Sequence, residues 1–212
     1  RRSRKAEREA LPAEIAAMAT QEPQASILKA LRRGTPEDAI LVVDSTQIGY
    51  YSRPFWPVYQ PHSYITSSYS GNLGYAYPTA LGAKVARPDR PVLSISGDGG
   101  FQYNVQELAT AVQYGINVIA VIFNDNSYGN VARDLDESWG GSYGADLVNP
   151  DFMKLPDAYG LVGMRASQPT DVGDLVRNAV RLDRPVLIEV PVGRMPRPPF
   201  FFYGRRQPKP QR

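Results

Sequence analysis

The sequence predicts an α/β domain, a doubly wound parallel sheet with helices on both faces. Short, continuous apolar runs such as PVLSIS (91–96) and NVIAVIFND (117–125) are typical of parallel strands that are buried on both faces. They alternate with helical segments such as NVQELATAVQYG (104–115), which ends at a glycine. Strands that alternate with helices in this way indicate strand–helix–strand crossovers and hence a parallel sheet.

The remaining elements follow the same alternation along the chain. Pro23 marks the start of a helix that stops at Gly34. A helix or turn is expected after the strand at 39–45 and extends through Tyr51. Residues 53–70 are rich in proline and aromatic residues, so we expect an irregular loop there, and such loops are often functional. The expected helices are 24–33, the segment after Leu73, 104–115, 150–159 and 170–182; the expected strands are 39–45, 91–96, 117–125, 162–166 and 185–190.

The two ends of the chain differ from its centre. RRSRKAERE opens the sequence and GRRQPKPQR closes it, and these stretches account for much of the net charge of +3. We expect a linker or lead-in helix at 1–21, one domain at 22–195 and a proline- and arginine-rich tail at 196–212. Clustered Arg and Lys can bind phosphates, but no nucleic-acid motif accompanies them, so we expect solvated ends and no nucleic-acid partner. Because the chain begins with Arg1, we expect a processed or fragmentary piece.

Composition excludes several classes of site. The chain has no cysteine, which excludes disulfides, thiolate catalysis and cysteine-based zinc sites. This fits a reducing compartment, and we expect a cytoplasmic protein. No apolar run approaches the roughly 18 residues of a membrane span, so we expect no membrane association.

Carboxylates follow two of the predicted strands. Asp98 comes directly after PVLSIS, and Asp125 ends NVIAVIFND, one strand–helix–strand crossover later. If these strands are neighbours, their ends lie about 5 Å apart at the same edge of the sheet. Two carboxylates, a backbone carbonyl and phosphate oxygens would suit octahedral Mg²⁺.

Glycines surround the first carboxylate. Gly97, Gly99 and Gly100 allow close backbone approach, and the helix start that follows them offers free N–H groups to a phosphate. The alternative is structural: Asp98 could be a turn or cap residue and Asp125 a strand-ending Asx turn. GDGGFQ lacks the third glycine of GxGxxG, and no P-loop GK[ST] is present, which excludes both of those nucleotide motifs.

The segment GDGGFQYNVQELATAVQYGINVIAVIFNDNSYGNV resembles the thiamine-diphosphate enzyme superfamily, specifically the C-terminal cofactor-binding domain of the acetolactate synthase-like group. The family motif is GDG followed, after a helix and a strand, by a short Asn-rich loop. The similarity extends over about residues 22–195. It implies the thiamine-diphosphate-binding fold, with thiamine diphosphate and Mg²⁺ as cofactors.

The resemblance also implies a role for each matching position. Asp98 would be the first side-chain ligand of Mg²⁺, and Ser127 would contribute its backbone carbonyl. Asp125 stands where the family usually has an Asn, the second side-chain ligand. This departure adds negative charge, which should strengthen Mg²⁺ binding and slightly repel the diphosphate.

The other implied cofactor contacts surround these ligands. Leu73, flanked by Gly71 and Gly74, matches the large apolar residue that wedges between the two rings of the cofactor; its alternative is a plain core leucine. Gln47 would approach the diphosphate end. The residues implied to line the diphosphate are Gly97, Gly99, Gly100, Tyr128 and Gly129.

The activity implied is that of a thiamine diphosphate- and Mg²⁺-dependent carboligase or decarboxylase acting on a small 2-oxo acid, of the acetolactate synthase type. The alternatives are a 2-oxo acid decarboxylase, a glyoxylate carboligase-like enzyme, or a non-catalytic module that binds Mg²⁺–diphosphate. In the family, an acidic residue of a pyrimidine-binding domain activates the cofactor, and this chain contains no such segment.

We therefore expect no catalytic residue in this chain. Glu107 lies inside the QELATA helix, where packing is its expected role. His62 is interpreted as a loop histidine, with substrate contact as the alternative. The expected partners are a pyrimidine-binding domain or subunit of the same enzyme, in a homodimer or homotetramer.

Overall fold

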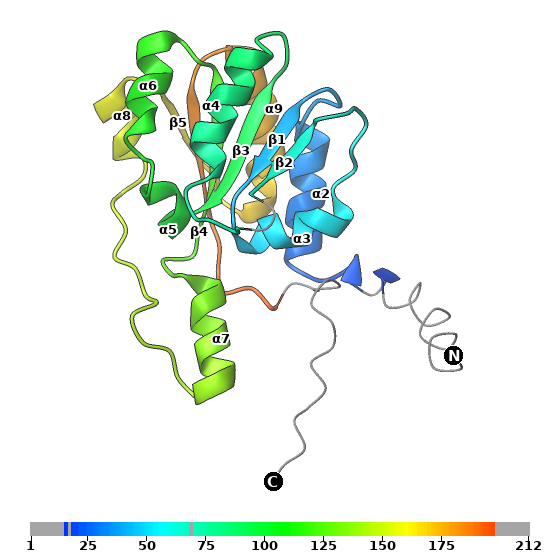
Figure 1. Cartoon of the computed structure of the whole chain (residues 1–212), viewed down its shortest axis with the longest axis vertical. Helices are drawn as coiled ribbons and strands as arrows, with labels where there is room; N and C mark the ends of the chain where they lie inside the picture. Colours follow the sequence, from blue (N-terminus) through cyan, green and yellow to red (C-terminus); the bar gives the residue numbers. More distant parts are fainter. Residues whose placement is uncertain (1–14, 17, 68–69, 198–212) are drawn as a thin grey trace.

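A computed structural model of the chain describes residues 15–16, 18–67 and 70–197 (Figure 1). Its centre is a 6-stranded sheet in the order β2-β1-β3-β4-β6-β5. Every neighbouring pair of strands is parallel. The strands are β1 (Ile40–Val43), β2 (Tyr64–Thr66), β3 (Val92–Gly97), β4 (Val118–Asn124), β5 (Val162–Arg165) and β6 (Val186–Pro191).

Helices cover both faces of this sheet, which confirms the predicted fold class (Figure 1). They are α2 (Gln24–Gly34), α3 (Gln47–Phe55), α4 (Ala76–Ala86), α5 (Asp98–Gln102), α6 (Glu107–Tyr114), α7 (Gly129–Trp139), α8 (Lys154–Tyr159) and α9 (Val172–Leu182), with a 3-10 turn at Pro169–Asp171.

Two separate cores result from the alternation of side chains along the strands. Leu93 and Ile95 of β3 point to the face covered by α2, α3 and α9, where they join Leu31 and Val176. Val92 lies on the other face, in a core built with α4, α6 and α8. Strands buried on both faces have no polar side, which explains their continuous apolar sequences.

The helices α2 and α9 cross at very short range. A Cβ atom on Gly34 would overlap the backbone of Gly173, and a Cβ on Gly173 would overlap the backbone of Ala30. Only glycine allows this approach, so the two helices pack with their backbones in direct contact.

Four local predictions need correction. The helix start expected after Gly100 comes earlier, because Asp98–Gln102 forms the short helix α5 directly at the end of β3. The helix predicted at 104–115 is shorter and begins at Glu107. The loop predicted at 53–70 contains an edge strand, Tyr64–Thr66, because the chain returns there to pair with β1. The helix α7 was not predicted at all.

The expected ends of the domain lie partly outside the described residues: most of 1–21 and the tail from 198 onward are not described. In the described part of the chain, every helix is too short or too polar to cross a membrane.

Candidate functional site

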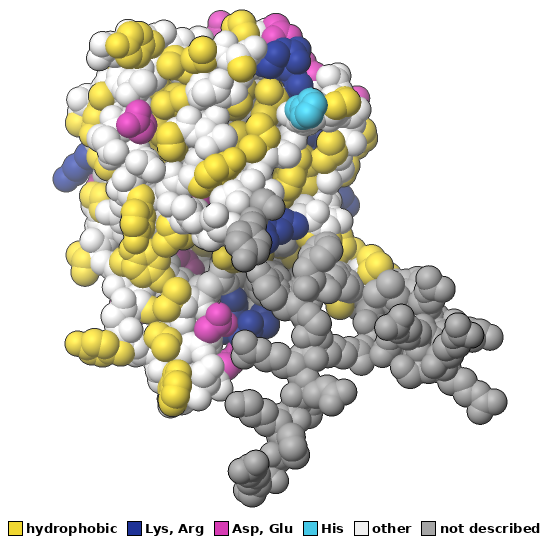
Figure 2. Space-filling view, in the orientation of Figure 1, with side chains coloured by type: hydrophobic (Ala, Val, Ile, Leu, Met, Phe, Trp, Pro, Cys, Tyr) yellow, Lys and Arg dark blue, Asp and Glu magenta, His cyan; other side chains and the backbone are white. Residues whose placement is uncertain are grey.

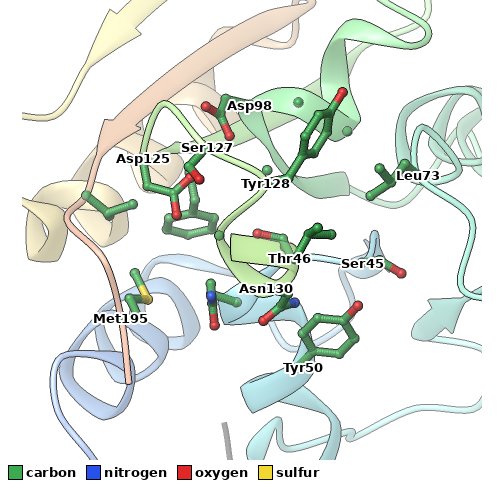
Figure 3. A pocket seen from close by; sticks show the side chains of 18 of the residues that line it. Ser45, Thr46, Tyr50, Leu73, Asp98, Asp125, Ser127, Tyr128, Asn130 and Met195 are labelled. Atoms are coloured by element: carbon green, nitrogen blue, oxygen red, sulfur yellow. The ribbon is translucent and has the colours of Figure 1, made fainter. Parts of the chain in front are cut away.

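A cleft of about 220 Å³ opens beyond the carboxyl ends of β1, β3 and β4 (Figure 3). In open parallel sheets this is the edge at which ligands bind. The structure brings all the predicted cofactor-binding residues together in its lining: Gln47, Gly71, Leu73, Gly97, Asp98, Gly99, Gly100, Asp125, Ser127, Tyr128 and Gly129. Sequence reasoning missed other lining residues, namely Ser45, Thr46, Tyr50, Phe123, Asn130, Val131, Val192 and Met195.

The two predicted carboxylate ligands face the same part of the cleft. Strands β3 and β4 are neighbours, and Gly97 pairs with Phe123 in the register, so the residues that follow each strand emerge side by side. Figure 3 shows Asp98, Asp125 and Ser127 on one side of the cleft and Leu73 on the opposite side. The prediction of paired carboxylates required β3 and β4 to be neighbours, and they are.

The two carboxylates lie close enough for the charge of Asp98 to oppose the ionisation of Asp125. Burial, and then the negative charge of Asp98, raise the pKa of Asp125 to about 7. Burial also raises the pKa of Asp98, although a hydrogen bond from Asn149 opposes that shift. The backbone of Ser127 acts in the opposite direction and lowers the pKa of both carboxylates. A pair of desolvated carboxylates is a site that binds a proton or a metal ion.

Asn149 connects the two carboxylate-bearing segments, and sequence reasoning missed it. Its Nδ2 donates to Asp98 Oδ2 at 2.6 Å, to Asn124 Oδ1 at 2.9 Å and to Asn126 Oδ1 at 3.2 Å. Asn124 in turn donates to the buried Glu189 at 2.8 Å. These contacts hold the end of β3 and the loop after β4 in one arrangement.

Glycines leave the floor of the cleft open. A Cβ on Gly99 would stand 2.5 Å from Tyr128 Cε1. A Cβ on Gly129 would stand 2.5 Å from Asp125 Oδ2 and 3.3 Å from Gln47 Nε2. Gln47 and Gly129 begin α3 and α7, whose first N–H groups have no partner within the helix and favour anions.

An unpartnered donor faces the same space. Gln47 is buried, and its Nε2 has no hydrogen-bond partner among the described residues. A buried donor without a partner costs roughly 1–3 kcal/mol, so a ligand with acceptor oxygens fits this position. The carboxylate pair, the open floor and this donor together suit a group that combines a cation with phosphate oxygens.

Leu73 lies on a loop that the end of β1 holds in place. The buried carboxylate of Asp44 accepts a hydrogen bond from Gly74 N–H at 2.9 Å. Ser45 Oγ donates to the carbonyl of Gly71 at 2.9 Å. Gly71 and Gly74 both adopt left-handed backbone angles, with φ of 61° and 79°, which glycine tolerates best. Asp44 therefore holds the loop that carries Leu73. In the sequence, only its position at the end of a predicted strand could have indicated this role.

The two other residues singled out from the sequence lie away from the cleft. Glu107 accepts a hydrogen bond from Thr110 Oγ1 at 2.8 Å on its own helix, and His62 is an exposed residue with φ of 56°. No group of three or more His, Cys, Asp and Glu side chains within the described ranges could hold a metal ion. The predicted ligand set of two carboxylates and one carbonyl would need oxygens from another molecule to complete it.

Comparison with known proteins agrees with this geometry. Residues 44–190 match the family model of the thiamine pyrophosphate enzyme, C-terminal TPP binding domain. Acetolactate synthase isozyme 3 large subunit of Escherichia coli is 35% identical over 80% of this chain and 30% of its own length. Acetolactate synthase large subunit of Haemophilus influenzae is 34% identical over 72% of this chain and 27% of its own.

Solved structures give the same result for the fold. The thiamine diphosphate-dependent 4-hydroxybenzoylformate decarboxylase of Rhodococcus jostii superposes with a TM-score of 0.72 at 33% identity, covering 80% of this chain and 32% of that one. Benzoylformate decarboxylase of Polynucleobacter necessarius gives 0.74 at 28% identity, covering 84% and 34%. The chain thus spans about a third or less of each of these proteins.

Proposed function

Since the chain belongs to the thiamine pyrophosphate enzyme family, through the C-terminal domain that binds this cofactor, we propose that it anchors the diphosphate of thiamine diphosphate through Mg²⁺. The proposed protein ligands are the carboxylates of Asp98 and Asp125 and the backbone carbonyl of Ser127. The single observation that carries the proposal is the pair of desolvated carboxylates at adjacent strand ends, next to a buried donor without a partner.

Mg²⁺ fits this donor set chemically. It prefers six oxygen ligands and usually combines one or two carboxylates with phosphate oxygens and water. A divalent cation would also remove the repulsion that raises the pKa of Asp125. We propose that Gly99, Gly100 and Gly129 admit the diphosphate to the floor of the cleft, and that Gln47 Nε2 donates to it.

Leu73 is the proposed wedge between the two rings of the cofactor. Its loop is held by Asp44 and Ser45, so its side chain is fixed opposite the carboxylates. When bound, the cofactor supplies the carbanion-stabilising chemistry that this family uses. The residues of this chain bind and orient it.

For the complete enzyme we propose a reaction on a small 2-oxo acid. Relatives named acetolactate synthases favour a carboligase. A decarboxylase is the second candidate, because the two solved structures described above carry that name. This chain corresponds to less than a third of the acetolactate synthases, so we propose that the activating acid lies on a pyrimidine-binding domain or subunit.

An exposed apolar surface beside the cleft supports a partner of this kind. Trp139 at the end of α7 is 82% exposed, and Tyr143 is 96% exposed. Tyr103, Val131 and Val148 are exposed as well. Figure 2 shows hydrophobic side chains along the side of the molecule that carries α5 and α7. We propose that the pyrimidine-binding part of the enzyme, in a homodimer or homotetramer, covers this surface.

Calorimetry tests the proposed anchor. The chain is titrated with thiamine diphosphate, with and without Mg²⁺, and binding is expected only when Mg²⁺ is present. Asp98→Ala should abolish it, whereas the control Asp174→Ala, on the exposed face of α9, should bind as the wild type does. Unchanged binding by Asp98→Ala would exclude the metal site. Recovery of the full-length gene and a screen of 2-oxo acids then tests the reaction.

A further inference from the structure

The orientation of the Gln47 side chain is set by a neighbour that the proposed site does not yet include. Gln47 Oε1 accepts a hydrogen bond from Arg133 Nη1 at 3.2 Å. A carboxamide has its acceptor on one side and its donors on the other. Because the guanidinium holds the oxygen, Nε2 is the end that remains beside the cleft, near Gly129.

Arg133 itself is a buried cation on α7, four residues after Gly129. Arg133 Nη2 donates to Asn130 Oδ1, and Arg133 Nε is buried without a hydrogen-bond partner among the described residues. The described residues contain no carboxylate that forms an ion pair with it. Burial, and then the nearby positive charge of Arg197, lower the pKa of Arg133, whereas the negative charges of Asp134 and Glu137 oppose that shift.

The acidic residues closest to Arg133 along α7 are already paired with other cations. Asp136 forms an ion pair with Arg194, and Asp134 and Glu137 both pair with Arg197. The carboxylates of α7 therefore bind the arginines of the segment after β6. Arg133 donates to Gln47 instead. A buried cation that forms no direct ion pair is unfavourable, and an anionic ligand in the cleft would complete this arrangement.

We propose that Arg133 is a positioning residue of the diphosphate site: by holding the oxygen end of Gln47, it turns the donor end of Gln47 toward the bound diphosphate. This inference rests on the proposed function, because it needs an anion in the cleft. It goes beyond that function by assigning a buried residue of α7 to the recognition of the diphosphate. If Arg133 only packed α7 against α3, its removal would change stability but not the affinity for the ligand.

The test uses the whole chain and two probes, Mg²⁺ with inorganic pyrophosphate and Mg²⁺ with thiamine diphosphate, titrated by calorimetry. Arg133→Met should weaken both affinities by about tenfold or more, the range of one charge-assisted hydrogen bond. Gln47→Ala should weaken them similarly. The double variant should be little weaker than either single variant, because Arg133 acts through Gln47.

A matched control removes a different arginine. Arg177→Met deletes an exposed arginine of α9 that pairs with Asp174, far from the cleft, and should bind both probes with wild-type affinity. Gln47→Glu covers the case in which Arg133→Met fails to fold. Its carboxylate can pair with Arg133 and keep the fold, but it lacks the donor, so its affinity for pyrophosphate should still fall by about tenfold or more.

The outcomes separate the two proposals. If the wild-type chain binds neither probe, the proposed function and this inference both fail. If the wild type binds, and folded Arg133→Met binds equally well, only the inference fails. Equal binding by Gln47→Glu would also remove the proposed contact between Gln47 and the diphosphate, while the metal site would still stand. If Arg133→Met weakens binding by the same factor in the Gln47→Ala background as in the wild type, Arg133 does not act through Gln47 and the positioning role is wrong.

Discussion

Gly129 offers a substitution that separates folding from ligand binding. It is the first residue of α7, it lines the cleft, and its φ lies outside the left-handed region. Alanine is therefore allowed there by the backbone, and alanine favours a helix over glycine by up to about 1 kcal/mol. We expect Gly129→Ala to leave the midpoint of thermal unfolding unchanged or slightly raised.

The expected loss in binding follows from two distances. The new methyl carbon would stand 2.5 Å from Asp125 Oδ2, whereas unstrained contacts between non-bonded heavy atoms lie near ~3.5 Å. The carboxylate must therefore move by several tenths of an ångström or more. Bonds to Mg²⁺ are about 2.0–2.1 Å long and require near-ideal octahedral geometry, so such a shift disrupts one charged ligand. We expect a fall in affinity of at least tenfold, about 1.4 kcal/mol.

The assay combines scanning calorimetry for stability with titration of Mg²⁺ and thiamine diphosphate for affinity. Gly82→Ala is the matched control, because it makes the same change inside α4, where nothing lies within 4 Å of the new Cβ. It should gain helix stability and keep wild-type affinity. If Gly129→Ala binds as tightly as Gly82→Ala, Asp125 does not ligate the metal from the position seen here, and the reasoning is refuted.

Three further predictions concern the ligands and the packing. Asn149→Ala should weaken Mg²⁺ binding several-fold in a metal titration, because Asp98 loses its 2.6 Å hydrogen bond; unchanged affinity would contradict this. With a pKa of about 7, Asp125 holds a proton that stabilises the metal-free fold at acidic pH, a contribution lost as pH rises through 7. Mg²⁺ competes with that proton, so its thermal shift should be larger at pH 8 than at pH 6, and Asp125→Asn should show little such difference. Gly173→Ala should lower stability by about 2 kcal/mol or more in denaturant unfolding, because its Cβ overlaps backbone of α2 that cannot move alone; wild-type stability would show that the helices can separate.

The elements predicted from sequence are those whose burial leaves a local signature. Strands β3, β4 and β6 are buried on both faces, so their sequences are mostly apolar, with Ser94, Ser96 and Glu189 as buried polar exceptions. The edge strand Tyr64–Thr66 is short and half-buried, so its sequence does not differ from that of a loop. Helix α7 is mostly polar and buries only Ala132 and Arg133, so its segment carries few of the apolar residues that mark a helix packed against a core.

The site divides in the same way. Asp98 and Asp125 could be predicted because a carboxylate directly after a buried strand is placed by the strand itself. Asn149 and Arg133 could not, because each meets its partner across a long stretch of chain: 51 residues separate Asn149 from Asp98, and 86 separate Arg133 from Gln47. Such contacts exist only once the sheet has formed, and no local pattern encodes them.

The departure at Asp125 connects these observations. An Asn at this position would be a neutral ligand, but Asp125 adds a second carboxylate to a desolvated site and raises its own pKa as a result. The chain places one donor against this charge, the Asn149 amide on Asp98, and an amide is neutral, so it does not balance two carboxylates. The nearby guanidinium of Arg133 is directed at Gln47 and Asn130 instead. This arrangement supports the proposal that the carboxylate pair holds a metal ion and that Arg133, through Gln47, faces the diphosphate, as a Mg²⁺–diphosphate anchor would require.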